Sequence, residues 1–491
     1  MKNFIKTFCL VTACCFSQIL SAQTQIGTDI DGEVAGDQAG VSVSMPDAQT
    51  VAIGSNTHDG NGTNAGHVRI FEWTGSLWQQ KGANIAGEAA GDFSGTAVSM
   101  PDPQTVAIGA FGNDAGGSDA GHVRVYEWIN NAWQQKGADI DGDDRRSWFG
   151  FAVSMPDAQT VGVGALLSNV NGNESGKVQV YEWTGSVWQQ KGTDIIGEAA
   201  GDQAGISVSM PDAQTIAVGA HRNGGNGFQA GHVRIYEWDG TAWQQKGADI
   251  GGEAVRDEFG TSVSMPDAQT VAIGAPVSNG GGTASGQVQV YEWDGTFWQQ
   301  KGADIFGDVL TSSGVSVSMP DAQTVAIGAD SDDTNGMNAG HVRIYQWTGS
   351  AWQQKGIDID GEALRDQSGR SISMPDAQTV AIGAANNDGN GDVSGHVRVY
   401  SLAGISSISS SAIGHSTAYP NPTNGQLSID MGSTYPEVSV VVRNVMGQEV
   451  LNQDYRATQQ IDLILEHAPG IYFVEVSTGD ERKVFEILKK E

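Results

Sequence analysis

The chain of 491 residues is poor in cysteine, in charged residues and in long apolar runs. Its three cysteines, Cys9, Cys14 and Cys15, all lie within the first 22 residues. If the chain is cleaved after Ala22, the mature protein has no disulfide and no thiol chemistry. After this N-terminal stretch no segment approaches 18 consecutive apolar residues, so we expect no transmembrane segment.

Residues 1–22 are predicted to be a secretory signal peptide. Lys2 and Lys6 give a positively charged start, the stretch 8–20 is mostly apolar, and the small residues Ser21 and Ala22 precede the expected cleavage. The alternative is a lipoprotein signal, because residues 11–14 (VTAC) resemble a lipoprotein box. Export through the Sec pathway is expected.

Basic residues are few. The chain has 26 Lys and Arg against 57 Asp and Glu, a formal net charge of -31 at pH 7. Such a surface repels phosphate backbones and anionic lipids, so we expect no nucleic-acid partner and no binding to a membrane surface. The acidity serves solubility in one interpretation and a cation-dependent binding face in the other.

Repetition is what the sequence has in abundance. The tetrapeptide Ser-Met-Pro-Asp occurs seven times, at intervals of 55 residues with one interval of 54. A supersecondary unit of this size cannot bury its own apolar surface, so the copies must pack on each other. The methionines of the seven copies are Met45, Met100, Met155, Met210, Met265, Met319 and Met374.

Each copy contains four short strand patterns separated by turn residues. In the copy around Met210 these patterns cover residues 205–210, 215–220, 232–238 and 243–250. Proline after the methionine and Asp-Gly after the third pattern are tight-turn signals. Four antiparallel strands per copy and seven copies predict an all-β fold, a seven-bladed β-propeller of four-stranded blades.

The two ends of the repeat region predict a closed ring. Residues 23–31 (QTQIGTDID) match only the fourth-strand motif WQQKGADID, whereas the last copy lacks a fourth strand after Tyr400. We therefore expect residues 23–31 to pair with residues 395–400 and to complete the seventh blade. An open solenoid would need capping units instead, and none is visible.

The copies resemble the FG-GAP repeats of integrin-α-type propellers. The residues that carry the resemblance are Phe149-Gly150, Phe259-Gly260, Gly274-Ala275-Pro276 and the Gly-x-Val-x-x-Tyr pattern of residues 231–236. The resemblance covers about residues 23–402 and implies the propeller fold. Integrin-type calcium sites lie in Asp-rich loops between strands one and two. Here that connection is a short Pro-Asp-Ala-Gln turn, so no calcium site is carried over.

A different module follows the repeats. Residues 403–417 are serine-rich and are expected to form a linker, and residues 418–491 contain the alternating strands of a small Ig-like β-sandwich. The module resembles the C-terminal sorting domain of the type IX (Por) secretion system. This implies export across a Gram-negative outer membrane by the type IX machinery, removal of the domain, and release or surface attachment of the rest. The motif residues are Tyr419, Pro420, Asn421, Pro422, Gly447, Gly470, Tyr472, Lys489 and Lys490.

Two residue types recur at fixed positions without pointing to chemistry. Third strands begin with histidine in five copies, but Lys177 and Gln287 take that position in the other two. A symmetric metal or catalytic site would not tolerate these replacements, so we interpret the histidines as structural and predict no metal site. Twelve of the 13 tryptophans form pairs around hairpin turns, such as Trp73 and Trp78. Cross-strand packing explains them, with a sugar-stacking platform as the alternative.

No catalytic motif is present. The sequence has no Ser/His/Asp set, no HExxH, no cysteine pair and no phosphate-binding loop, so we expect that the protein is not an enzyme. Loops rich in Asn, Gly and Asp, such as residues 330–335 and 386–392, lack the ligand spacing of a calcium loop. We interpret them as turns and expect no cofactor, with weak calcium binding as the alternative.

Loop variation indicates where a ligand would bind. In a four-stranded blade the loops after strands two and four emerge on one face, and here these loops differ between copies while the other connections are almost constant. We call this side the variable face and the opposite side the constant face. Seven acids open the loops between blades and are predicted to form an acidic ring there: Glu33, Glu88, Asp143, Glu198, Glu253, Asp308 and Glu362.

The loop that enters the third blade is the outlier, with residues of the types that dominate binding hot spots. Drift of a surface loop is the alternative explanation. The candidate ligand-binding residues are Asp143, Asp144, Arg145, Arg146 and Trp148 of this loop, with Arg256 and Arg365 of two other inter-blade loops.

We therefore expect a secreted or cell-surface binding or adhesion protein that holds an unidentified protein or glycan ligand on the variable face. One alternative is a glycan-active hydrolase with its site at the central channel, which would need carboxylates or a nucleophile unique to one or two blades. The other alternative is a structural surface-layer protein.

Overall fold

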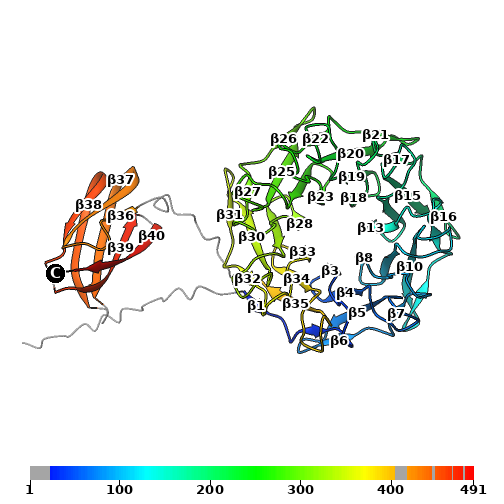
Figure 1. Cartoon of the computed structure of the whole chain (residues 1–491), viewed down its shortest axis with the longest axis horizontal. Helices are drawn as coiled ribbons and strands as arrows, with labels where there is room; N and C mark the ends of the chain where they lie inside the picture. Colours follow the sequence, from blue (N-terminus) through cyan, green and yellow to red (C-terminus); the bar gives the residue numbers. More distant parts are fainter. Residues whose placement is uncertain (1–22, 404–416, 445–447, 467, 479–480, 491) are drawn as a thin grey trace, which may run out of the picture.

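The computed structural model describes residues 23–403, 417–444, 448–466, 468–478 and 481–490 (Figure 1). The expected signal peptide, nearly all of the expected linker and Gly447 lie outside these residues. The described residues form strands and no helix, and among them there is accordingly no helix that could cross a membrane.

Residues 23–402 form seven antiparallel sheets arranged around a central opening, which confirms the seven-bladed β-propeller (Figure 1). The first strand of each blade lies next to the opening: β3 (Ser42–Asp47), β8 (Ala97–Asp102), β13 (Phe149–Asp157), β18 (Ser207–Asp212), β23 (Ser262–Asp267), β28 (Ser316–Asp321) and β33 (Ser371–Asp376). We number the blades 1 to 7 in this order.

The second and third strands are the centre of each blade. The second strands are fully buried and apolar on both sides: β4 (Thr50–Ser55), β9 (Thr105–Ala110), β14 (Thr160–Ala165), β19 (Thr215–Ala220), β24 (Thr270–Ala275), β29 (Thr324–Ala329) and β34 (Thr379–Ala384). The third strands are β5 (His67–Trp73), β10 (His122–Ile129), β15 (Lys177–Trp183), β20 (His232–Trp238), β25 (Gln287–Trp293), β30 (His341–Trp347) and β35 (His396–Ser401).

The fourth strand of each blade is broken into two short strands, where the sequence predicted one continuous strand. In blade 1 the break lies at Gly82, which has a φ of +80° and lies against the Trp128 ring of blade 2. A Cβ at this position would lie 2.6 Å from that ring, so only glycine fits. The broken strands are β6 (Trp78–Gln80) and β7 (Ile85–Ala86), β11 (Ala132–Gln135) and β12 (Ile140–Asp141), β16 (Trp188–Gln190) and β17 (Ile195–Ile196), β21 (Trp243–Gln245) and β22 (Ile250–Gly251), β26 (Trp298–Gln300) and β27 (Ile305–Phe306), and β31 (Trp352–Gln354) and β32 (Ile359–Asp360).

The N-terminal segment closes the ring as predicted. Strands β1 (Thr24–Gln25) and β2 (Ile30–Asp31) both pair with β35, with Gln25 opposite Tyr400 and Ile30 opposite Val397. Blade 7 therefore takes its outermost strand from the start of the chain and its three inner strands from the end of the repeats.

The hydrophobic cores lie between blades. One core joins Val68 and Ile70 of blade 1 to Met100 and Ile108 of blade 2, and the other blade boundaries have corresponding clusters. The core that closes the ring joins Ile30 and blade 7 to blade 1. A single repeat thus has no core of its own, as its size predicts.

The repeated serine before each Ser-Met-Pro-Asp methionine joins neighbouring blades. The Met100 backbone N–H of blade 2 donates to the Ser44 Oγ of blade 1 at 3.0 Å. The same bond closes the ring, because the Met45 N–H donates to Ser373 Oγ of blade 7 at 2.9 Å.

Five of the six tryptophan pairs contact the lysine of the preceding blade. The rings of Trp128 and Trp133 lie opposite each other on β10 and β11 with centroids 5.2 Å apart, which confirms cross-strand packing. Lys81 Nζ of blade 1 lies 5.4 and 5.7 Å from these rings and donates to Pro103 O at 2.7 Å. The Trp133 indole N–H donates in return to Lys81 O at 2.8 Å. The rings are therefore already covered by a cation of the neighbouring blade.

The C-terminal unit is a small β-sandwich around a core of its own. It consists of β36 (Thr417–Tyr419), β37 (Gln426–Asn444), β38 (Glu449–Ile464), β39 (Gly470–Thr478) and β40 (Glu481–Lys489). The long strand β37 pairs with β36 near its start and with β39 near its end, and β38 lies along its other edge. Its core contains Leu427, Val440, Val474 and Ile487.

The closure of the ring can be tested at Ile30, which is 5% exposed in the core between blades 7 and 1. Ile30→Ala is expected to lower the free energy of unfolding by about 2–4 kcal/mol, because it leaves a cavity in that core. The control is Ile196→Ala, in the corresponding strand of blade 3, where the side chain is 39% exposed and the expected loss is below about 1 kcal/mol. Chemical denaturation measures both values, and equal losses would contradict a sealed ring.

The lysine contact can be tested by comparing two lysines. Lys136 Nζ lies 2.7 Å from Glu127 Oε1 and 5.5 Å from the Trp183 ring, whereas Lys355 faces blade 7, which has no tryptophan pair. Lys136→Met is therefore expected to cost about 1–2 kcal/mol more stability than Lys355→Met, because it removes both an ion pair and a cation–π contact. Denaturation midpoints measure the difference. Equal losses would show that the rings and the glutamate contribute nothing to blade cohesion.

Candidate functional site

The two sets of variable loops lie together on one face, as the blade topology predicts. The residue before each third strand forms a parallel bridge with the loop that enters the next blade, for example Gly66 with Ser94 and Gly231 with Phe259. The same bridge occurs at the ring closure, between Gly395 and Ala39. Each blade boundary therefore brings one loop of each set into contact.

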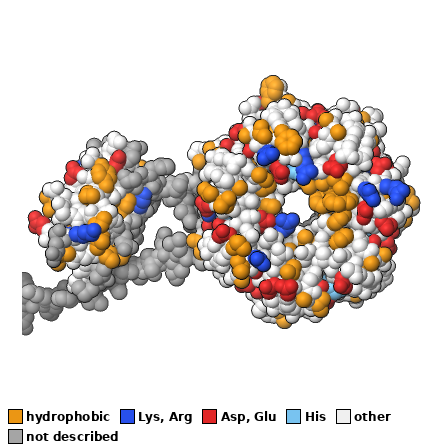
Figure 2. Space-filling model, viewed as in Figure 1, with side chains coloured by type: hydrophobic (Ala, Val, Ile, Leu, Met, Phe, Trp, Pro, Cys, Tyr) orange, Lys and Arg blue, Asp and Glu red, His pale blue; other side chains and the backbone are white. Residues whose placement is uncertain are grey.

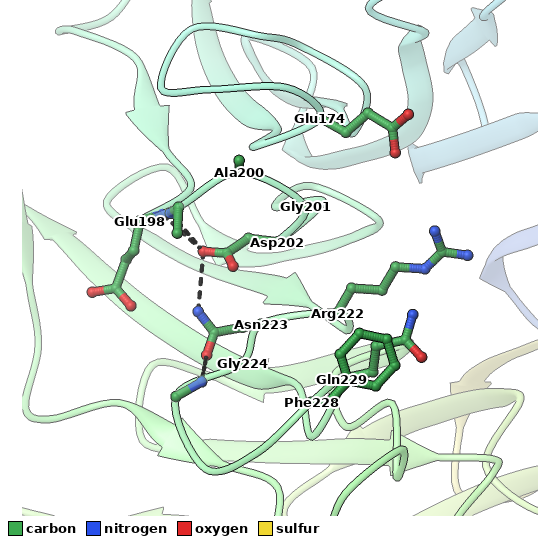
Figure 3. Close-up of a pocket in the computed structure, with 12 residues that line it drawn as sticks. Glu174, Glu198, Ala200, Gly201, Asp202, Arg222, Asn223, Gly224, Phe228 and Gln229 are labelled. Carbon is green, nitrogen blue, oxygen red and sulfur yellow. Dashed lines mark hydrogen bonds between the residues drawn. The ribbon is translucent and has the colours of Figure 1, made fainter.

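A buried acid shapes most of the loops between blades. Asp202 Oδ2 accepts the Glu198 and Ala199 N–H groups at 3.0 and 2.9 Å and the Asn223 amide at 3.0 Å (Figure 3). The outlier loop of blade 3 has Ser147 at this position, completely buried, with its Oγ donating to Ala120 O at 3.0 Å. The outlier loop is therefore anchored by the hydroxyl of Ser147, where most of the other loops use a buried carboxylate.

The two acids of the outlier loop have partners within the protein. Asp143 and Asp144 both contact the ammonium of Lys177, which takes the position of the repeated histidine. Asp144 also accepts the Ser168 hydroxyl at 2.9 Å. Both acids therefore fix the loop to the third strand of the same blade.

Three arginines occupy exposed loop tips in an unusual backbone conformation. Arg146, Arg256 and Arg365 have φ values of 58°, 67° and 69° at a position that is glycine in blades 1, 2 and 4. A left-handed conformation costs a non-glycine residue about 1–2 kcal/mol. The guanidinium of Arg256 lies 5.8 Å from the Phe228 ring, and Arg145 is exposed beside Arg146.

Trp148 belongs to a cluster of four aromatic rings that the sequence did not reveal. It stacks on Phe151 with centroids 6.0 Å apart and lies 4.9 Å from Phe111, which in turn stacks on Phe93 at 5.0 Å. All four rings are half-buried. We call these four residues the aromatic cluster. The only signal in the sequence is that each of them breaks the repeat, since the positions equivalent to Phe111 are Asn56, Leu166, His221, Pro276, Asp330 and Ala385.

The rim of the central opening differs from one side to the other. In Figure 2 hydrophobic side chains border the opening on the side where Figure 1 labels β13 and β18. At the boundary of blades 6 and 7 the residues that correspond to Phe111 and Phe151 are Asp330 and Arg370, which form an ion pair at 3.0 Å. The aromatic cluster therefore lies at a blade boundary whose counterpart between blades 6 and 7 carries an ion pair instead.

The channel itself has an apolar and hydroxylated lining. A cavity of about 290 Å³ is bounded by the starts of all seven first strands. Among the described residues that line it, the charged one is Arg370, and the others are Val, Ile, Ala, Ser and Thr. These lining residues supply no carboxylate pair for glycoside hydrolysis.

A second hollow, of about 610 Å³, lies between the loops of blades 3 and 4 (Figure 3). Residues 198–202 and 222–229 form its walls, and Glu174 borders it. Arg222 and the 63% exposed Phe228 lie in these walls, so the hollow offers one cation and one ring among acids.

The acids of the predicted ring have internal partners. Glu88, Glu198 and Glu362 lie 3.5, 3.6 and 3.5 Å from the arginine of the third strand of the same blade. Asp308 pairs with Arg343, Asp143 with Lys177, and Glu253 accepts the Gln289 amide at 3.1 Å. Five of the seven acids thus lie beside a lysine or arginine of the blade that carries them.

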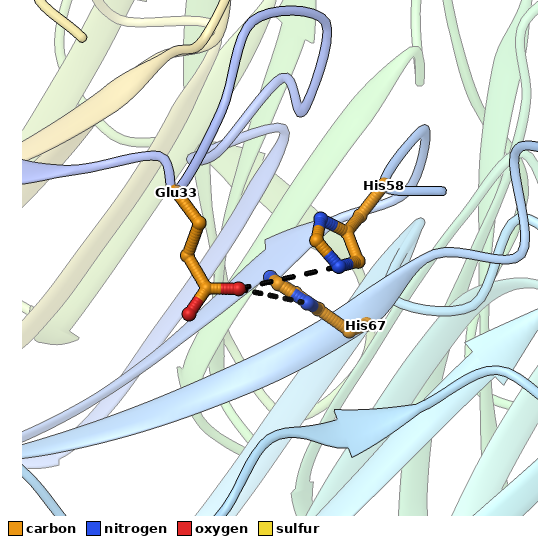
Figure 4. Close-up of side chains that lie close together, drawn as sticks. All are labelled: Glu33, His58 and His67. Carbon is orange, nitrogen blue, oxygen red and sulfur yellow. Dashed lines mark ion pairs between the residues drawn. The ribbon is translucent and has the colours of Figure 1, made fainter. Parts of the chain in front are cut away.

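The repeated histidines are buried, and in four of them burial lowers the pKa. Burial, with the charge of nearby Arg124 or Arg234, lowers the pKa of His122 and of His232 to about 4. In blade 1, Glu33 Oε2 lies 3.8 Å from His67 Nδ1 and 4.0 Å from His58 Nε2 (Figure 4). The Asn84 amide donates to the same Glu33 oxygen at 2.9 Å, so this acid already has a donor.

The loops rich in Asn and Asp use their oxygens to make turns. Asn387 Oδ1 accepts the Gly389 N–H at 2.7 Å, and Asp388 Oδ1 accepts the Val393 N–H at 2.8 Å. These contacts support the interpretation of residues 386–392 as a turn.

The sorting-motif residues meet along the last strand. Asn421 Oδ1 accepts the Leu488 N–H at 2.9 Å, and the Lys490 N–H donates to Thr423 O at 2.8 Å. Gly470 lies opposite Lys489, and the buried Tyr472 donates its hydroxyl to Ala468 O at 2.6 Å. Tyr419 is 47% exposed and Pro420 and Pro422 are also exposed.

Family models identify both parts of the chain. The secretion system C-terminal sorting domain matches residues 417–490, and the FG-GAP repeat matches residues 252–291 in blade 5. The chain therefore contains an FG-GAP repeat within its β-propeller and a C-terminal sorting domain, so both resemblances seen in the sequence are confirmed for these segments. The sorting domain supports secretion to the cell surface by the type IX machinery.

Solved structures add only weak likenesses, and no curated protein sequence matches the chain. The β-propeller domain of the trilobed protease from Pyrococcus furiosus is 12% identical over 70% of this chain and 90% of its own, with a TM-score of 0.40. The GH74 xyloglucanase from Xanthomonas campestris is 10% identical over 92% and 80%, with a TM-score of 0.36. A protein of unknown function from Dyadobacter fermentans is 11% identical over 77% and 99%, with a TM-score of 0.38. Likenesses of this strength carry no argument about function.

Proposed function

We propose that the protein is a secreted or cell-surface binding protein that holds a protein or glycan ligand on the variable face and catalyses no reaction. The proposed organisation is a Sec signal peptide at residues 1–22, a binding propeller at 23–402, a linker at 403–417 and a removable sorting domain at 418–491. The type IX machinery is its partner during export.

The aromatic cluster is the observation that carries this proposal. The four half-buried aromatic side chains lie at one blade boundary and give one sector of the near-symmetric propeller a surface suited to binding. The exposed Arg145 and Arg146 lie in the same loop as Trp148. Aromatic rings and arginines dominate binding hot spots, and rings also stack on sugars. Arg256 and Arg365 are proposed secondary contacts on the same face, whereas Asp143 and Asp144 are proposed to hold the loop in shape.

The hydrolase alternative receives no support from the channel, because its described lining has no acid that could protonate a leaving group. The role of a surface-layer protein would need a repeating contact between copies. The asymmetric placement of the aromatic cluster favours one ligand at one sector instead.

The binding face can be tested with the full-length protein on glycan and matrix-protein arrays, followed by titration of each ligand found. The double variant Phe111→Ala/Trp148→Ala is expected to weaken binding by about 2 kcal/mol or more, roughly 30-fold, because it removes the rings at the centre of the proposed contact. The control is Phe297→Ala, which removes a 58% exposed ring from a turn of the constant face. A ligand that resists the double variant and is weakened by Phe297→Ala would overturn the assignment of the face.

The role of the C-terminal unit can be tested by deleting residues 419–491. The propeller is expected to remain folded, because the described strands of the C-terminal unit pair only with each other and share no core cluster with the blades. The truncated protein is expected to stay in the periplasm. Fractionation and protease treatment of intact cells measure its location, and normal delivery to the surface would refute the sorting role.

A further inference from the structure

Each blade has a gap between two polar residues. One is the acid that opens the inter-blade loop, and the other is the residue just before the last short strand of the same blade. In four blades a nitrogen donor fills this gap. Lys177 Nζ lies among Asp143, Asp144 and Asp194 in blade 3, and Arg343 bridges Asp308 and Asp358 in blade 6. The Gln289 amide donates to Glu253 and Asp304 in blade 5, and the Asn84 amide to Glu33 in blade 1. The gap is therefore occupied by hydrogen-bond donors, which are cationic in blades 3 and 6 and neutral amides in blades 1 and 5.

Blades 2 and 4 have a buried histidine at this place. His122 Nδ1 lies 3.9 Å from Glu88 Oε2 and 3.8 Å from Asp139 Oδ2. In blade 4, His232 Nδ1 lies 3.8 Å from Glu198 Oε2 and 3.7 Å from Asp249 Oδ2. In each blade the three ligand-type atoms lie within 4.8 Å of one another.

His122 has no hydrogen-bond partner for either ring nitrogen among the described residues, although its side chain is 0% exposed. An unpaired polar group buried in this way is costly, and here Nδ1 faces two carboxylate oxygens. A neutral imidazole offers the lone pair of one ring nitrogen to a cation, and Nδ1 is the nitrogen that faces the carboxylates.

In each acid one carboxylate oxygen already contacts a glutamine or an arginine, and the other oxygen faces the histidine. Gln135 donates to Asp139 Oδ1 at 2.6 Å, and Arg124 NH1 lies 3.5 Å from Glu88 Oε1. The same arrangement occurs in blade 4, where Gln245 donates to Asp249 Oδ1 at 2.7 Å and Arg234 lies 3.6 Å from Glu198 Oε1. Outer contacts of this kind orient the ligands of metal sites.

We propose that the clusters Glu88/His122/Asp139 and Glu198/His232/Asp249 each bind one divalent transition-metal ion of the zinc class. Imidazole with carboxylates suits zinc, cobalt or nickel and not calcium or magnesium. Ligand atoms 3.7–3.9 Å apart can share one ion at the usual distances of about 2.0–2.2 Å with a moderate inward shift. Glu88 and Asp139 are 45% and 27% exposed, so water can complete the coordination.

The charges around the site permit a cation. Arg124 opposes it, but its second terminal nitrogen donates to Ala86 O at 2.7 Å and the guanidinium is directed at the outer oxygen of Glu88. Asp92 and Asp141 add negative charge to that of Glu88 and Asp139. In blade 7 the donor set differs, since His396 faces Asp29 and Asp31 and its cluster does not include the loop acid Glu362. A bound ion would join the inter-blade loop, the third strand and the last strand of one blade at the base of the variable face.

The test uses the full-length protein, freed of metal by a chelator and titrated with Zn²⁺ by calorimetry and with Co²⁺ by visible absorption. At least two Zn²⁺ ions per chain are expected to bind, with a rise in the unfolding midpoint that Ca²⁺ does not produce. The double variant His122→Gln/His232→Gln is expected to lose both ions, an affinity loss of more than about 100-fold, together with the corresponding Co²⁺ absorption.

The substitutions are chosen so that a loss of metal binding is not caused by misfolding. Blade 5 naturally has Gln287 at the histidine position and blade 1 has Asn84 at the aspartate position, so His→Gln and Asp→Asn are replacements that the blade already accommodates. Asp139→Asn/Asp249→Asn is therefore expected to weaken Zn²⁺ binding to the same two sites while the metal-free unfolding midpoint stays near that of the unaltered protein. Absence of Zn²⁺ binding at micromolar concentration, or Zn²⁺ binding that both double variants retain, would overturn the proposal.

Discussion

The contact between the lysine of one blade and the tryptophan pair of the next is the interaction on which the ring depends. In blades 1 to 4 the ammonium lies against two indole rings of the next blade, and in blade 5 it lies against the Trp347 ring. In all five blades the lysine carbonyl accepts an indole N–H. The glycine after the lysine fits only because it has no side chain. At the ring closure Ile26 takes the lysine position, yet its carbonyl still accepts the Trp78 N–H at 2.7 Å. The most regular part of the repeat thus serves cohesion between blades.

This use of the constant residues explains why the two faces differ. The motif Ser-Met-Pro-Asp supplies the inter-blade bond to the methionine N–H and a tight turn in which Asp47 accepts the Gln49 N–H at 2.8 Å. Loops on the opposite face need only keep one buried capping residue and one bridge to the next blade. They can therefore vary, and variation of this kind on a rigid scaffold is where binding surfaces arise.

The periodicity of the sequence predicted the number of blades and the closure of the ring. It missed features that depend on contacts between elements that the sequence alone does not bring together. The blade count and the ring closure followed from seven copies and a displaced fourth-strand motif, and the two family resemblances followed from their own motif residues. The break of the fourth strand was missed because Lys81-Gly82 looks like part of a strand until the neighbouring Trp128 ring is in place. The aromatic cluster was missed because Phe111 and Phe151 belong to neighbouring blades and meet only across the boundary between them. Replacement of histidine by Lys177 argued against a metal, although the lysine itself fills the position of a cation.

Hydrogen–deuterium exchange across all seven blades in one experiment tests the central claim most directly, that the ring is closed and that the blade built from both ends of the chain opens no earlier than the others. The account predicts slow and similar exchange for the second strands β4 to β34, with fast exchange confined to the variable loops, because buried and bridged strands open only in global unfolding. Early exchange of β33, β34 and β35 relative to the other blades would contradict it, because it would show a ring that is open at the seventh blade.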